Sequence, residues 1–77
     1  MDNKTQAIAL ANAVLSEQIE KLVKMIELLN WLRQWFPSLI VGGTGIPSNE
    51  TVETWNDSQL DAYATDCQTP IMEYADN

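Results

Sequence analysis

The residues of this chain that could do chemistry are mainly acidic, and most of them lie in its second half. Asp57, Asp61 and Asp66 are spaced four and five residues apart, and Glu50 and Glu53 are three apart. An EF-hand loop alternates oxygen ligands around a glycine, and none of these carboxylates follows that pattern. We therefore expect a solvated acidic face with no metal site and no cofactor. Weak cation binding is the alternative.

The other groups that catalysis requires are missing or isolated. The chain has no histidine, and its one cysteine, Cys67, has no base to activate it. The sequence Gly-Gly-Thr-Gly at residues 42–45 resembles a phosphate-binding loop in composition only, because no Gly-Lys-Ser/Thr follows it, and a plain turn is favoured. We predict that the protein is not an enzyme and that Cys67 is a small packing residue.

Charge divides the chain into two unequal parts. Residues 1–41 hold four acidic and four basic residues, whereas residues 42–77 hold seven acidic residues and no basic one, which accounts for the net charge of −7. An acidic segment of this kind repels nucleic acid and anionic lipid, so we expect neither nucleic-acid nor membrane binding. A larger protein with a basic or apolar surface is the expected partner. The residues predicted to contact it are Glu50, Glu53, Asp57, Asp61, Asp66 and Glu73.

The first half of the chain is dominated by a helical pattern, onto which we expect the acidic second half to pack. From Lys4 to Phe36 apolar residues return every three or four positions, and Pro37 ends the run. The pattern predicts a mainly α fold with one long amphipathic helix, about residues 4–36, in an oligomeric coiled coil or helical bundle. Glu17 with Lys21 would form an ion pair on its outer face.

A heptad with Ile8 at position d runs through this helix, and it defines a candidate oligomer interface. Its a positions include isoleucine and its d positions are mainly leucine, which favours two parallel strands, but its e and g positions are almost uncharged. We therefore expect self-association between dimer and tetramer, with a trimer or more favoured. A smaller second stripe contains Leu10 and Val14. The predicted interface residues are Ile8, Asn12, Leu15, Ile19, Leu22, Val23, Met25, Ile26, Leu29, Leu32 and Phe36.

The remainder of the chain is expected to fold onto this helix. We divide the sequence into a helix segment (1–41), a Gly-rich turn (42–47) and an acidic, helix-containing segment (48–77) that is too rich in aromatic residues to be disordered. Residues 51–55 fit either a strand or a helix. Packing of the acidic segment within one chain or by exchange with a neighbour is left open. Trp31 and Trp35 are expected in the core, with a protein-binding hot spot as the alternative.

Two functions follow from these features. The first is a non-enzymatic, homo-oligomeric assembly or adaptor protein, such as a small structural or virion-type component, acting through protein–protein contacts. The second is a small acidic inhibitor that binds a basic surface of a larger protein by mimicking nucleic-acid charge. A chain of 77 residues buries only about 60% of its unfolded surface, which favours a supplement such as oligomerisation. With no visible secretion signal, we expect a cytoplasmic protein or one assembled into a particle.

Overall fold

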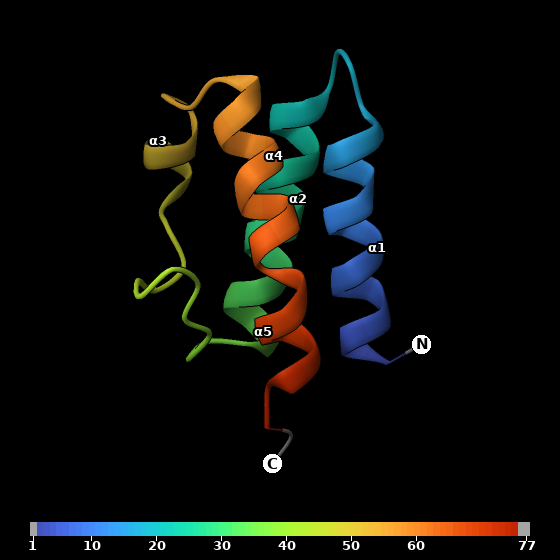
Figure 1. Ribbon diagram of the computed structural model, residues 1–77, viewed down its shortest axis with the longest axis vertical. Helices are drawn as coiled ribbons and strands as arrows, with labels where there is room; N and C mark the ends of the chain where they lie inside the picture. Colours follow the sequence, from blue (N-terminus) through green and yellow to red (C-terminus); the bar gives the residue numbers. More distant parts are fainter. Residues whose placement is uncertain (1, 76–77) are drawn as a thin grey trace.

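Helices account for nearly all the regular structure in residues 2–75, the part of the chain that this computed structural model describes. They are α1 (Asn3–Ser16), α2 (Lys21–Trp35), α3 (Asn49–Val52), α4 (Asp57–Asp66) and α5 (Gln68–Glu73). α1 and α2 form an antiparallel hairpin, a long connection then returns along one side, and α4 and α5 run back beside the hairpin in the direction of α2 (Figure 1). The mainly α class is confirmed.

The prediction of one continuous helix over residues 4–36 is wrong at Glu17–Glu20, where the chain turns back on itself. Glu17 leaves the helix with an extended backbone (φ −78°, ψ 141°), and its N–H donates to Ala13 O at 3.0 Å. No glycine or proline lies in this turn. The break is therefore imposed by packing and not by a local helix-breaking residue.

The physical reason for the hairpin is the apolar area that it buries. About six helical hydrogen bonds, those of the N–H groups of residues 18–23, are lost at the turn, each with a net contribution of about 1 kcal/mol. Folding back packs α1 against α2, and Ala7, Ala11 and Val14 of α1 are fully buried, as are Met25 and Leu29 of α2. Each large apolar side chain contributes about 1.5–3 kcal/mol when buried. For a single chain, burial of several such side chains outweighs the lost bonds.

The core extends from this hairpin into the second half of the chain. Val52 of α3, Leu60 and Ala64 of α4 and Ile71 of α5 are buried, and α4 packs against both helices of the hairpin. In the single chain, the acidic segment packs on the first half through α4 and α5. The buried residues that complete the core are Leu28, Leu32, Phe36, Leu39, Val41, Tyr63 and Cys67.

Local signals explain how the shorter helices begin and end. Residues 51–55 are not a strand: α3 begins after Ser48, whose Oγ accepts from Thr51 N at 3.2 Å. α4 begins with a capping box, in which Asn56 Oδ1 accepts from Gln59 N at 2.9 Å and Gln59 Oε1 accepts from Asn56 N at 2.8 Å. Pro70 lies in the first turn of α5, where a missing N–H is tolerated, and it accounts for the separation of α5 from α4.

The connection between α2 and α3 contains one tight turn. Val41 and Thr44 exchange two backbone hydrogen bonds of 2.9 and 3.2 Å across it. Gly42 and Gly43 occupy its centre with φ of 61° and 80°, a backbone conformation that favours glycine. Arg33 secures the far end of the connection, because its Nη2 donates to Pro47 O and to Asn49 Oδ1, both at 2.8 Å.

Candidate interaction surfaces

Lys21 is the most buried charged side chain of the described residues. Its Nζ donates to Asp61 Oδ1 at 2.7 Å and to Val14 O at 2.7 Å. The second bond satisfies a carbonyl in the last turn of α1, which has no helical partner there. The predicted pair of Lys21 with Glu17 on an outer face is therefore wrong, because α1 and α2 are not one helix.

The acidic residues predicted to meet a partner are placed mainly on the surface. Asp61 differs, because it is partly buried and its carboxylate is bound to Lys21, although its side chain keeps 44% of its accessible area. Glu50, Glu53 and Asp57 lie close together in the sequence, from α3 to the first residue of α4. The exposed residues of the set are Glu50, Glu53, Asp57, Asp66 and Glu73.

The basic residues, in contrast, are all engaged within the chain. Lys21 is held as described, and Arg33 binds the connection before α3. Lys4 Nζ donates to Met72 O at 3.0 Å, and Lys24 Nζ lies 3.6 Å from Glu27 Oε2. These four are the chain's entire complement of lysine and arginine. All four basic side chains are therefore engaged in contacts within the chain.

The predicted oligomer-interface residues are divided between the core and the surface. Met25, Leu29, Leu32 and Phe36 lie in the core of the single chain. Another three, Ile8, Leu22 and Ile26, are half-buried against that core. Asn12 is exposed, and its Oδ1 accepts from Gln68 Nε2 at 3.1 Å.

Three members of the same set are exposed apolar residues. Ile19 lies in the turn between α1 and α2 with 94% of its area accessible. Val23 on α2 is 52% exposed and Leu15 on α1 is 38% exposed. The hairpin thus covers most of the apolar residues of the heptad set and leaves these three uncovered.

The tryptophan pair is only partly in the core. Trp31 packs against the core, and its Nε1 donates to Asn3 O at 3.0 Å. Trp35 is 43% exposed, with its ring centroid 5.9 Å from that of Trp31. The expectation of burial therefore holds for Trp31 and is wrong for Trp35.

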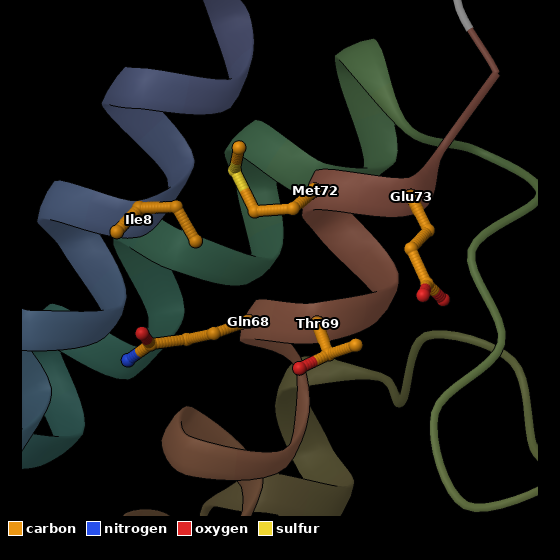
Figure 2. A pocket seen from close by; sticks show the side chains of 5 residues that line it. All are labelled: Ile8, Gln68, Thr69, Met72 and Glu73. Carbon is orange, nitrogen blue, oxygen red and sulfur yellow. The ribbon is translucent and has the colours of Figure 1, made fainter.

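A shallow hollow of about 420 Å³ lies between α1 and α5. Figure 2 shows Ile8 of α1 and Met72 of α5 pointing toward each other, with Gln68 reaching from α5 toward α1. Thr69 and Glu73 complete the lining, and Glu73 supplies its one ionisable group. Acid–base catalysis usually needs two ionisable groups of different pKa. The lining of this hollow offers only one, Glu73.

Two buried groups have perturbed chemistry without forming a reactive site. Burial raises the pKa of the Cys67 thiol to about 12, and its Sγ donates to Ala64 O at 3.4 Å. Burial also raises the pKa of Tyr63 well above 10. Within residues 2–75 the hydroxyl of Tyr63 has no hydrogen-bond partner. The centroid of its ring lies 5.7 Å from the ring centroid of Trp55. A neutral thiol is a poor nucleophile, so Cys67 is a packing residue here.

Sequence reasoning missed the burial of Lys21, and it recognised the buried face of α1 only in part, as the smaller stripe with Val14. Ala7, Ala11 and Val14 are spaced four and three residues apart, which is the spacing of one helix face. With Leu10 they form the second stripe beside the stronger heptad. Two apolar stripes on one stretch of helix were the available signal that α1 has separate neighbours.

Comparisons with known proteins add no relative to this description. No family model, no curated protein and no solved structure matches the chain. Within residues 2–75, none of the helices combines the length and apolar content needed to cross a bilayer. Nor does this part of the chain bring three histidine, cysteine or carboxylate side chains together as metal ligands. Fold and surface thus define the class: a small helical protein with an acidic exterior.

Proposed function

We propose that the protein is a non-catalytic binding protein whose acidic surface docks on a basic surface of a larger protein, as a small inhibitor or adaptor does. The supporting observation is that the basic and the acidic side chains have different surroundings. All four basic side chains contact other parts of the chain, whereas Glu50, Glu53 and Asp57 are exposed. Carboxylates left free in this way attract a cationic surface and speed association with it.

The same carboxylates give the proposal its competitive mechanism. A basic groove that binds nucleic acid is adapted to closely spaced phosphates, and carboxylates on a rigid helical frame offer a similar charge. Glu50, Glu53 and Asp57 lie on or beside two short helices that are anchored to the core through Val52 and Leu60. The acidic groups are therefore held in place and do not depend on a disordered tail.

The test is an affinity isolation from the native host with a matched pair of variants. Glu50→Gln with Glu53→Gln removes two charges from the proposed surface, and Glu17→Gln with Glu20→Gln removes two from the α1–α2 turn. Both variants change the net charge from −7 to −5. We expect the wild type and the Glu17→Gln/Glu20→Gln variant to capture a basic protein, and the Glu50→Gln/Glu53→Gln variant not to capture it. Added salt should release the captured protein. Equal capture by both variants, or capture insensitive to salt, contradicts the proposal.

A second candidate is homo-oligomeric assembly, in which the protein is a structural or adaptor component. It is favoured by the exposure of Leu15, Ile19 and Val23, which all belong to the heptad set. Exposed apolar side chains gain when a second copy covers them. Sedimentation equilibrium over the micromolar range tests it, and a monomer at every concentration contradicts it.

A further inference from the structure

The turn between α1 and α2 lacks the residues that usually end a helix. Residues 17–20 are Glu-Gln-Ile-Glu, all compatible with a helix interior, and three of the four have high helix propensity. No non-glycine residue of the described chain has a positive φ, so the turn does not depend on a strained backbone either. Its local sequence favours a continuous helix, and only tertiary contacts hold it bent.

The heptad runs through this turn without a change of register. Leu15 is at d, Ile19 at a and Leu22 at d, so a continuous helix would place them on one stripe. In the hairpin, Ile19 is 94% exposed and Leu15 is 38% exposed. The hairpin thus exposes apolar residues at the one place where a straightened helix would align them.

We propose that the hairpin opens at Glu17–Glu20 into one helix and that two copies exchange α1, each receiving the other's α1 against its own α2, α4 and α5. This inference deepens the self-association candidate, on which it rests, and names its occupant as a second copy of the chain. Exchange of an identical element through a short hinge is a low-cost route to a dimer. The contacts that α1 makes with α2, α4 and α5 in the closed chain are remade between the copies, and only those at the hinge change.

The ion pair of Lys21 supports this route because it does not need to break. Lys21 and Asp61 belong to the same half of the chain, on α2 and α4, and they stay together when α1 leaves. Of the bonds that Lys21 makes, only the one from its Nζ to Val14 O crosses the hinge, and the Val14 O of the second copy takes its place. The new contact in the dimer is between the two straightened hinges, where Ile19 and Leu15 of both copies become covered.

The test compares Gln18→Pro with Gln18→Ala in the full chain. Proline at position 18 suits the hairpin, because it requires an extended residue before it and Glu17 is already extended (ψ 141°). In a helix interior, proline costs enough to lower the yield of exchanged dimer by about a hundredfold or more. Alanine removes the same side chain and favours the helix. Each protein is refolded at high concentration, diluted, and measured by light scattering after gel filtration.

We expect a slowly dissociating dimer for the wild type and Gln18→Ala, and a monomer for Gln18→Pro. NMR carbon shifts of residues 17–20 in the dimer should be helical. A dimer of Gln18→Pro in equal yield, or non-helical shifts in the wild-type dimer, overturns the exchange while leaving self-association in place. A wild type that stays monomeric under all conditions overturns both. If Gln18→Pro fails to fold, Gln18→Gly makes the same comparison, with a smaller loss of dimer expected.

Discussion

Lys21 Nζ lies 2.7 Å from Asp61 Oδ1 and 2.7 Å from Val14 O, so one ammonium group joins α1, α2 and α4. The side chain of Lys21 is 9% exposed and that of Asp61 is 44% exposed, which makes the pair half-buried. A lysine at this depth needs its partners, because an unpaired buried charge is costly. The contact ties the end of α1 and the start of α2 to α4.

Removal of the carboxylate should therefore destabilise the protein. We expect Asp61→Ala to lower the free energy of unfolding by about 1–2 kcal/mol, less than for a fully buried pair because Asp61 is partly in water. Urea denaturation followed by circular dichroism measures it. Asp66→Ala is the control, since Asp66 is exposed on the same helix and should change stability by less than about 0.5 kcal/mol. Equal losses in the two variants would show that the ion pair has no special role.

Tyr63 offers the opposite case, a polar group whose removal should cost nothing. Its hydroxyl is buried with no partner in the described chain, so Tyr63→Phe removes a desolvated group without breaking a bond. We expect stability to be unchanged or raised by about 1 kcal/mol in the same urea experiment. Tyr63→Ala should lose about 3 kcal/mol or more, because the ring packs against Trp55. A clear loss in Tyr63→Phe would mean that a buried water or ligand binds the hydroxyl.

Alkaline pH should destabilise the fold through Cys67. Burial raises its thiol pKa to about 12, whereas the unfolded chain titrates near its ordinary value of about 9. The folded state thus binds the proton more tightly, and this stability is full below pH 9 and lost as the pH rises from 9 to 12. We expect Cys67→Ala to flatten the decline of stability with pH across that window.

Thiol reactivity checks the same prediction by another route. Native protein at pH 8 should react with a thiol reagent far more slowly than protein in urea, because the neutral buried thiol is a poor nucleophile. Rapid modification of folded protein would contradict the burial of Cys67.

The small face of α1 should be intolerant of larger side chains. Ala11 is fully buried on the face of α1 that packs into the core, whereas Ala9 on the same helix is exposed. We expect Ala11→Leu to cost about 1–3 kcal/mol by overpacking. Ala9→Leu has similar helix propensity and should change stability by less than about 0.5 kcal/mol. Thermal and urea unfolding of the two variants make the comparison.

The sequence determined the helical class and several of its boundaries. Apolar spacing identified the helical stretches on both sides of the turn, and Pro37 marked the end of the first half. The placement of the acidic residues at the surface also followed from their types, since five of the six are exposed. These features depend on local chemistry, which is written in neighbouring residues.

Only the tertiary structure decided that the first half is a hairpin. Residues 17–20 contain nothing that ends a helix, so the turn exists because packing α1 on α2, with Ala11 and Val14 buried, gains more free energy than the helical hydrogen bonds of a straight helix. The same packing decided that Lys21 is buried and that Asp61 is its partner. Contacts between residues far apart in the chain cannot be read from local spacing, because their free energy appears only when both surfaces meet.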